Sequence, residues 1–259
     1  MWFVTKTFNR LLKFIAPLFY LGTKRINGFA VICYGKDTVF IVRPNSLDAV
    51  MLYEIWKCNS YREALIRRND VVVDIGANIG GYAVRAAKCG AKVIAYEPSP
   101  GTYDLLVRNL MINKCTTVKS YNIAIGSKKG ELMLNVDPQA SAYDSIYQTY
   151  SSTKKIRVPC ISLHEIFTRN RLAKIDVMKI DVEGSEYEIL LSATRDDLRK
   201  IQTIILEFHD CFDHGHSKRE LEIALRNNGF VIREMTHWYQ RLLLRSGLLL
   251  ATQIVKPKQ

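Results

Sequence analysis

The sequence predicts an α/β fold in which helices cover both faces of a mostly parallel β-sheet. From residue 71 onward, short and wholly apolar segments alternate with segments of helical spacing. Strands that are apolar on both faces are typical of a parallel sheet buried between helices. The last two expected strands have no helix between them, so they can pair antiparallel. The chain has 259 residues, 48% of them hydrophobic, which is enough for one or two domains with a substantial core.

Two elements are expected ahead of the alternating region. Residues 29–43 have the pattern of a β-hairpin with its turn at residues 35–37. Residues 46–58 are expected to form a helix that is capped by Asn45 or Ser46.

The alternating region supplies the sheet and the helices that cover it. Strands are expected at 71–75, 92–96, 117–121, 175–180, 203–208, 230–234 and 248–255. Helices are expected at 80–89, 101–112, 185–191 and 218–227. Residues 131–136 alternate as a further strand, and the polar, tyrosine-rich residues 137–155 are predicted to be a functional lid or a mobile loop. We expect one main domain over residues 61–259, preceded by an N-terminal extension over residues 1–60.

The start of the chain has the pattern of a basic amphipathic helix. Its apolar residues recur at helical spacing: Val4, Phe8, Leu11, Leu12, Ile15 and Leu18. Lys6, Arg10 and Lys13 fall on the opposite side. Such a helix can pack on the protein's own core or on a partner, or it can lie on the inner face of a membrane as a peripheral contact. No apolar run approaches the ~20 residues of a membrane span.

Charge and cysteine usage restrict the partners and the compartment. The formal net charge is +12, but the excess is concentrated in residues 1–43 and 235–259, so the middle of the chain has no basic face for a nucleic acid. We therefore expect a small-molecule or glycan substrate and no nucleic acid. The six cysteines are scattered without a CxxC pair, which favours reduced thiols in the cytoplasm and no zinc site.

The strongest functional signal follows the first strand of the alternating region. This strand ends at Asp74, and the glycines Gly76 and Gly80 open the next helix. A turn without Cβ atoms lets the backbone approach a ligand closely. Glu97 stands at the end of the next strand, where a carboxylate can accept hydrogen bonds from both hydroxyls of a ribose. This arrangement indicates a cofactor that contains adenosine.

Asp74 distinguishes between the possible cofactors. A carboxylate beside the glycine turn would repel the diphosphate of a dinucleotide, and the GxGxxG fingerprint is absent. The same carboxylate suits an ammonium group, held directly or through water. We therefore predict S-adenosylmethionine, which carries an ammonium, a ribose and no phosphate. The alternative is an unrelated doubly wound domain with a glycine turn.

Three further strand ends contribute candidate residues. Asn122 and Ile123 follow a strand and are expected to border the adenine, although an ordinary turn explains them as well. Asp181 and Glu183 end another strand at the carboxyl edge of the sheet, where ligands bind in open α/β folds.

Glu207 and His209 reach the same edge on one face of their strand. We predict that His209 is a general base and that Asp181 and Glu183 place the substrate or cofactor. A purely structural histidine is the alternative for His209. These side chains could also hold Mg²⁺ or Mn²⁺, but their order is no recognised metal signature, and we predict no metal.

Taken together, these segments resemble the FkbM family of S-adenosylmethionine-dependent methyltransferases. The resemblance spans residues 71–210 and rests on seven motifs: VDIGANIGGY (73–82), AYEPSP (95–100), LLVRNLMINK (105–114), NIAIG (122–126), VPCISLHEI (158–166), MKIDVEGSEYEIL (178–190) and ILEFHD (205–210). It implies a class I methyltransferase fold, with a seven-stranded, mostly parallel sheet and an antiparallel last strand. It also implies O-methylation of hydroxyls on sugars or other small metabolites.

The family pattern also assigns roles to residues. By matching motif, the methionine end of the donor would be held by Asp74, Gly76, Ala77, Asn78 and Gly80. Glu97 would take the ribose, and Asn122 with Ile123 would border the adenine. The pattern assigns no catalytic residue. One departure is His164, where family members usually have Asp.

Two other functions remain as alternatives. An RNA or protein methyltransferase is disfavoured, because an enzyme that methylates adenine amino groups is expected to have a DPPY- or NPPY-like strand end where this chain has DVEG. A catalytically silent binding module, tethered to a membrane by the basic helix, is the other.

Overall fold

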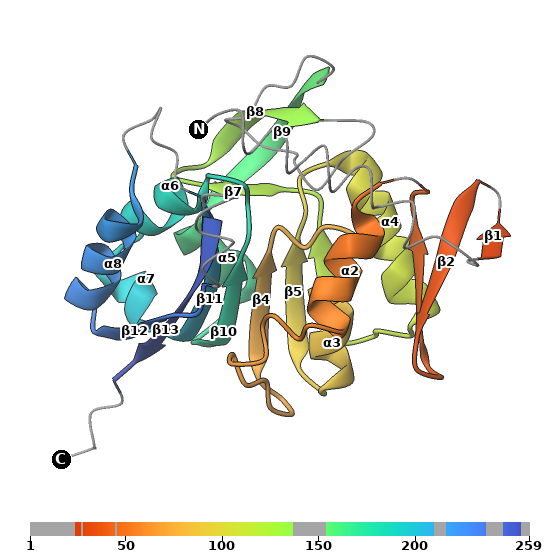
Figure 1. Cartoon of the computed structure of the whole chain (residues 1–259). Coiled ribbons are helices and arrows are strands. Elements are labelled where there is room, and N and C mark those ends of the chain that lie inside the picture. Colours follow the sequence, from red (N-terminus) through yellow and green to blue (C-terminus); the bar gives the residue numbers. More distant parts are fainter. Residues whose placement is uncertain are drawn as a thin grey trace.

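The computed structural model describes residues 24–26, 28–44, 46–136, 154–209, 216–236 and 246–254 (Figure 1). The predicted extension helix in the first 23 residues and most of the polar segment 137–155 therefore lie outside the described residues. No helix of the described part is long and apolar enough to cross a membrane.

A seven-stranded sheet organises the molecule. Its strands, from one edge to the other, are β12 (Phe230–Glu234), β13 (Ser246–Gln253), β11 (Ile201–His209), β10 (Ile175–Ile180), β4 (Val71–Ile75), β5 (Lys92–Tyr96) and β6 (Val118–Tyr121). Neighbouring strands from β11 to β6 pair parallel, whereas β13 runs antiparallel to both β11 and β12. The predicted parallel sheet with an antiparallel last strand is confirmed.

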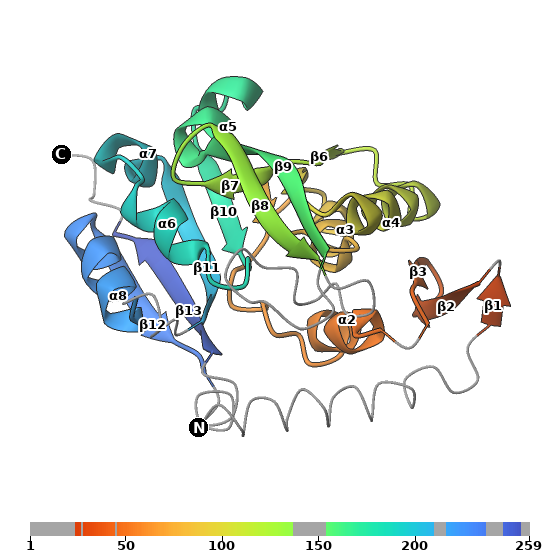
Figure 2. The same ribbon diagram turned by 90° about the horizontal axis from the view of Figure 1, so that it is seen from above.

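Helices cover the two faces of this sheet (Figures 1 and 2). One face carries α2 (Asp48–Trp56), α3 (Gly81–Lys88) and α4 (Pro100–Ile112). The other carries α5 (Leu163–Asn170), α6 (Glu186–Leu191), α7 (Arg195–Arg199) and α8 (Lys218–Asn227). Successive strand residues alternate between two cores: Val72 packs in the cluster with α2 and α3, and Val73 in the cluster with α5 and α6. Because both faces are buried, the middle of the sheet is apolar; Ile204, Ile205 and Leu206 of β11, for example, are 0% exposed.

A small second sheet was not predicted as a sheet, although the predicted strand 131–136 is confirmed as part of it. It consists of β7 (Ala124–Gly126), β9 (Lys154–Ser162) and β8 (Gly130–Val136), with β9 between the other two. In Figure 1 it lies above the arrowheads of β4 and β5, over the carboxyl ends of the large sheet. The α5 helix that follows was not predicted. It begins with a capping box formed by Ser162 and Glu165, which is a recognisable sequence signal for the start of a helix.

The N-terminal part packs into the same core as the alternating region. It contains β1 (Lys24–Ile26) and the predicted hairpin of β2 (Phe29–Tyr34) and β3 (Thr38–Val42). The α2 helix begins later than expected, at Asp48, because Leu47 occupies the N-cap position. Ser46 is not the N-cap residue, but its hydroxyl accepts a hydrogen bond from the Asp48 amide, the first of the helix, at 3.1 Å. Asn45, the other predicted cap, lies outside the described residues.

Two asparagines attach β3 to α4. The fully buried Asn109 accepts a hydrogen bond from the Ile41 amide (2.7 Å) and donates to the carbonyls of Ile41 (3.1 Å) and Ile79 (2.9 Å). One turn later, Asn113 exchanges hydrogen bonds with both backbone groups of Val39. The i, i+4 spacing on the helix thus matches the i, i+2 spacing on the strand, and the open edge of β3 is paired.

We expect Asn109→Leu to lower the free energy of unfolding by about 2 to 4 kcal/mol, because three buried backbone groups lose their partner. Urea titration followed by circular dichroism measures this loss. Asn227→Leu, at an exposed position of α8, is the matched control and should change stability by under about 0.5 kcal/mol. Equal stability of the two variants would contradict the bracing role of Asn109.

Candidate active site

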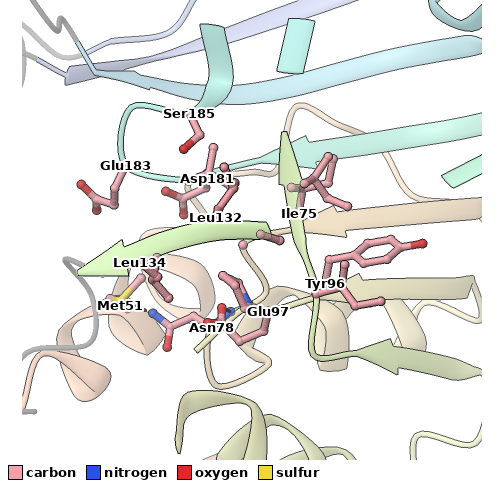
Figure 3. Close-up of a pocket in the computed structure, with 16 residues that line it drawn as sticks. Met51, Ile75, Asn78, Tyr96, Glu97, Leu132, Leu134, Asp181, Glu183 and Ser185 are labelled. Carbon is pink, nitrogen blue, oxygen red and sulfur yellow. Dashed lines mark hydrogen bonds between the residues drawn. The ribbon is translucent and has the colours of Figure 1, made fainter. Parts of the chain in front are cut away.

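A pocket opens at the carboxyl ends of β4, β5 and β10, below the small sheet. It encloses about 670 Å³, including the part that is open to solvent. Its lining contains Met51, Ile75, Gly76, Asn78, Tyr96, Glu97, Pro98, Ile123, Ala124, Ile125, Leu132, Leu134, Asp181, Val182, Glu183 and Ser185. In Figure 3 the acids form two groups, Glu97 beside Asn78 and Asp181 near Glu183, with Leu132 and Leu134 of β8 between them. Its position at the carboxyl edge of the strands is that of a ligand site in an open α/β sheet.

The glycine turn after β4 is fixed by packing. Gly76 has a φ of +76°, and a Cβ on it would lie 1.8 Å from the carbonyl oxygen of Asp181. The Gly76 and Ala77 amides both donate to the Tyr96 carbonyl, at 3.0 and 2.9 Å. Gly80, with a φ of +92°, caps α3. The glycine at position 76 is therefore required by the neighbouring strand as well as by any ligand.

Glu97 is held rigidly at the end of β5. Its carboxylate accepts hydrogen bonds from the amides of Asn78 and Ser99, both at 2.9 Å, and the residue is 6% exposed. The Asn122 side chain donates to the carbonyls of Glu97 (2.8 Å) and Pro98 (2.9 Å). Asn122 thus supports the strand end from behind, while Glu97 and Ile123 form the pocket wall.

A buried lysine connects the glycine turn with the acids of β10. The ammonium nitrogen of Lys179 lies 3.3 Å from a carboxylate oxygen of Asp74 and 3.3 Å from one of Asp181. It also donates to the Gly76 carbonyl at 2.8 Å. The Asp181 carboxylate in addition accepts a hydrogen bond from the hydroxyl of Tyr61, at 3.3 Å.

The ion pairs of Lys179 affect the pKa values of the groups that form them. Burial raises the pKa of Asp74, and the ammonium of Lys179 opposes that rise. Burial works to lower the pKa of Lys179, but the carboxylates of Asp74 and Asp181 raise it above its usual value. Lys179 is therefore a permanent cation that the two acids share. Asp74 is fully buried and does not line the pocket; the acid of this group that does is Asp181.

A second polar cluster surrounds His209. Its Nδ1 lies 3.2 Å from a carboxylate oxygen of the fully buried Glu186. Its Nε2 lies 3.5 Å from Glu183 and 3.9 Å from Glu207. Glu183 has a left-handed backbone with a φ of 53°, uncommon for a residue with a side chain.

The close packing of these acids around the imidazole changes the pKa values of His209 and Glu207. Burial works to lower the pKa of His209, yet the carboxylates of Glu183, Glu186 and Glu207 raise it well above the usual value. Burial and the charge of Asp181 raise the pKa of Glu207 to about 8, against the opposing effect of His209. The carboxylates around His209 therefore favour its imidazolium form.

Metal coordination is an alternative use of the same side chains. Asp181, Glu183 and His209 each offer one ligand atom, and these atoms lie within 4.8 Å of one another. Carboxylate and imidazole ligands suit Mn²⁺ or Mg²⁺.

The structure brings together most of the residues predicted from sequence. Six of them line the pocket: Gly76, Asn78, Glu97, Ile123, Asp181 and Glu183. Five do not: Asp74, Ala77 and Gly80 lie in or beneath the turn, Asn122 lies behind Glu97, and His209 lies behind Glu183. His164, where the family pattern has Asp, is outside the pocket and pairs with the buried Asp197 at 3.2 Å.

Sequence reasoning missed Lys179 and Glu186. A lysine inside a buried strand is itself a signal, because an unpaired charge there is costly. Glu186 opens a helix and had no visible partner in the sequence, since His209 follows 23 residues later.

We expect Lys179→Met to destabilise the protein by about 3 to 5 kcal/mol, because it leaves two carboxylates without their cation. Urea titration at neutral pH measures this, with Lys92→Met at the exposed start of β5 as the control. Adding Asp74→Asn should restore part of the stability. A Lys179→Met protein as stable as the control would show that the two ion pairs contribute nothing.

Comparison with known proteins identifies the family. Residues 74–232 match the Methyltransferase FkbM domain. The methyltransferase sdnD of Sordaria araneosa is 24% identical over 75% of this chain and 87% of its own. The hexuronic acid methyltransferase AglP of Haloferax volcanii is 30% identical over 60% of this chain and 66% of its own. The 31-O-demethyl-FK506 methyltransferase FkbM of Streptomyces tacrolimicus is 25% identical over 74% of this chain and 85% of its own.

Solved structures agree on the fold. The methyltransferase SMU.1697c from Streptococcus mutans, described as putative and solved in complex with SAH, has a TM-score of 0.50 at 10% identity and covers 76% of this chain and 97% of its own. An rRNA methylase from Streptococcus thermophilus has a TM-score of 0.50 at 11% identity and covers 78% of this chain and 96% of its own. At these identities the likeness concerns the class I methyltransferase fold alone. The matched domain spans more than half of the chain, so the chain belongs to the FkbM methyltransferase family and is a methyltransferase.

Proposed function

We propose that the protein uses S-adenosylmethionine to methylate a hydroxyl group on a sugar, a glycan or another small metabolite. The observation that carries this is the charge of the pocket. Glu97 lies on one side and Asp181 with Glu183 on the other, and the described lining contains no lysine or arginine.

The donor set fits S-adenosylmethionine better than a dinucleotide. The donor carries a sulfonium, an ammonium and a carboxylate, so its net charge is positive, and it has no phosphate. A diphosphate would face three carboxylates without a cationic partner, which is strongly unfavourable. Glu97 is positioned to hold the ribose, and Asp181 and Glu183 are the acids available to the cationic part of the donor or to the acceptor. The sequence predicts that Asp74 holds the ammonium of the donor, directly or through water; in the structure its carboxylate is paired with Lys179.

The protein's own contribution is to orient the acceptor and to receive a proton. When bound, S-adenosylmethionine supplies a methyl group: a C–O bond forms while the S–C bond breaks, the sulfur keeps the electron pair, and the hydroxyl proton leaves. His209 would accept this proton at Nε2, while Asp181 and Glu183 hold hydroxyl groups of the acceptor by hydrogen bonds. Because the surrounding carboxylates favour the imidazolium, the base form of His209 becomes more populated as the pH rises.

The names of the relatives support this acceptor class. AglP is named for a hexuronic acid, and the Streptomyces tacrolimicus enzyme for the 31-O-demethyl form of FK506. Neither name concerns a nucleic acid, and the likeness to rRNA methylases is one of fold.

Compartment and membrane contact stay predictions. The five cysteines in the described part of the chain are free thiols, which is in keeping with a reducing, cytoplasmic location. The basic helix of the first 25 residues is predicted either to pack on the protein or a partner or to bind the inner face of a membrane peripherally, and most of these residues lie outside the described part.

The first test is donor binding. S-adenosylmethionine and its demethylated product should raise the melting temperature, whereas NAD should not. Glu97→Ala should weaken donor binding about 10- to 100-fold in calorimetry, because charge-assisted hydrogen bonds to the ribose are lost. Glu131→Ala, an exposed carboxylate on β8, is the control and should bind normally. Absence of binding to the unaltered protein would refute the proposed donor.

The second test concerns the proton. His209→Ala should keep the donor affinity and lower kcat by about 10²- to 10⁴-fold. For the unaltered enzyme, kcat should be low at acidic pH and rise as the imidazolium loses its proton, at a pH above the usual histidine range. Radiolabelled methyl transfer to a panel of methyl glycosides measures both. Transfer should persist in EDTA; a loss that Mn²⁺ restores would instead make Asp181, Glu183 and His209 metal ligands.

A further inference from the structure

We propose that Glu186 is a positioning residue for His209: it holds Nδ1 as the protonated nitrogen and turns Nε2 toward the pocket acids. This inference rests on the proposed function, in which Nε2 receives the hydroxyl proton. Glu186 is the first residue of α6, directly after the turn that carries Asp181 and Glu183.

Both oxygens of the Glu186 carboxylate accept hydrogen bonds from backbone amides, one in the turn after β10 and one at the end of β11. One oxygen accepts a hydrogen bond from the His209 amide at 2.6 Å and lies 3.2 Å from His209 Nδ1. The other oxygen accepts from the Gly184 amide at 2.8 Å. Glu186 is 0% exposed, so these contacts are made without competition from water. A single buried side chain therefore fixes both the backbone and the ring of His209.

The contact at Nδ1 determines the tautomer. A carboxylate can only accept, so Nδ1 must carry its proton, and the neutral ring has its lone pair on Nε2. That nitrogen lies 3.5 Å from Glu183, which lines the pocket. The ring side chain is 14% exposed, so its orientation is set by these neighbours and not by solvent. The arrangement is that of a general base with a buried acid behind it.

The carboxylate supplies two things at this position. Its two oxygens accept from two different backbone amides, those of His209 and Gly184, whereas a glutamine would offer only one acceptor oxygen. It also places a negative charge beside the imidazolium that forms when Nε2 takes a proton. Among the described residues, the acids that face His209 are Glu186 from α6, Asp181 and Glu183 from the turn after β10, and Glu207 from β11. Of these four acids, Glu186 is the one that contacts Nδ1.

The decisive measurement needs no acceptor. The protein is labelled with ¹⁵N at its histidines, of which there are five, and His209 is assigned with the His209→Asn variant. At a pH where His209 is neutral, the ¹⁵N shifts show which ring nitrogen carries the proton. We expect the proton on Nδ1 and a bare Nε2. A bare Nδ1 would overturn the proposal, whether or not the protein binds S-adenosylmethionine.

The kinetic test uses Glu186→Gln. We expect normal donor affinity, a nearly unchanged acceptor KM and a kcat lowered about 100-fold. Because one of the acids that raise the pKa of His209 is gone, the rise of kcat with pH should move to lower pH. The Nδ1–H signal of His209 should also shift. Unchanged kcat and an unchanged pH profile would contradict a positioning role.

Glu220→Gln is the matched control. Glu220 belongs to α8, and its carboxylate lies 3.3 Å from Nδ1 of His216, which precedes that helix. Neither residue lines the pocket, so this carboxylate–histidine pair has no access to the substrate. This variant should match the unaltered enzyme in kcat and in the His209 spectrum. If Glu186→Gln fails to fold, the tautomer of the unaltered protein still decides the matter. If no methyl transfer from S-adenosylmethionine occurs at all, the proposed function fails while the tautomer result stands on its own.

Discussion

The ion pairs of Lys179 are the interaction on which the site depends. Three segments that are far apart in the sequence meet at this ammonium: the end of β4 with Asp74, the glycine turn with the Gly76 carbonyl, and the end of β10 with Asp181. Without a cation, two carboxylates could not both stay charged in so buried a place. The lysine allows one acid to remain in the core and leaves the other at the pocket wall. The acid of this pair that faces the pocket is therefore Asp181 after β10, and not Asp74 at the end of the neighbouring strand β4, which the sequence motif contains.

Close packing adds a second constraint at the same point. The turn after β4 lies so near to the end of β10 that position 76 has no room for a side chain, and the Cβ of any other residue would meet the Asp181 carbonyl. The sequence predicts that this glycine allows a ligand to approach the backbone. In the structure it is required even without a ligand, because a Cβ at this position would overlap the Asp181 carbonyl oxygen. The same residue thus serves the fold and the site.

The elements with a strong local pattern could be predicted from the sequence. The strands 71–75, 92–96, 175–180 and 230–234 and the helix 218–227 have the predicted bounds, because apolar runs and flanking glycines define them. The position of Glu97, Asp181 and Glu183 at the carboxyl ends of their strands could be predicted from the same pattern. Partners across strands could not be predicted: nothing local shows that Lys179 meets Asp74, 105 residues earlier, or that Glu186 meets His209. Of the small sheet only the strand 131–136 was predicted. β7 was missed because it has three residues, and β9 because it begins inside the polar segment 137–155.

The small sheet has a further consequence. Leu132 and Leu134 face the pocket from β8, whereas every residue assigned to the donor or to proton transfer belongs to the large sheet and its loops. The upper wall of the pocket (the ceiling, formed by β8 of the small sheet) and the lower wall (the floor, formed by the ends of the large sheet) are thus separate segments of the chain. Mutations in the ceiling can reshape the space for an incoming molecule while the floor keeps its chemistry. Such a division gives evolution a simple way to produce enzymes of one reaction and many acceptors.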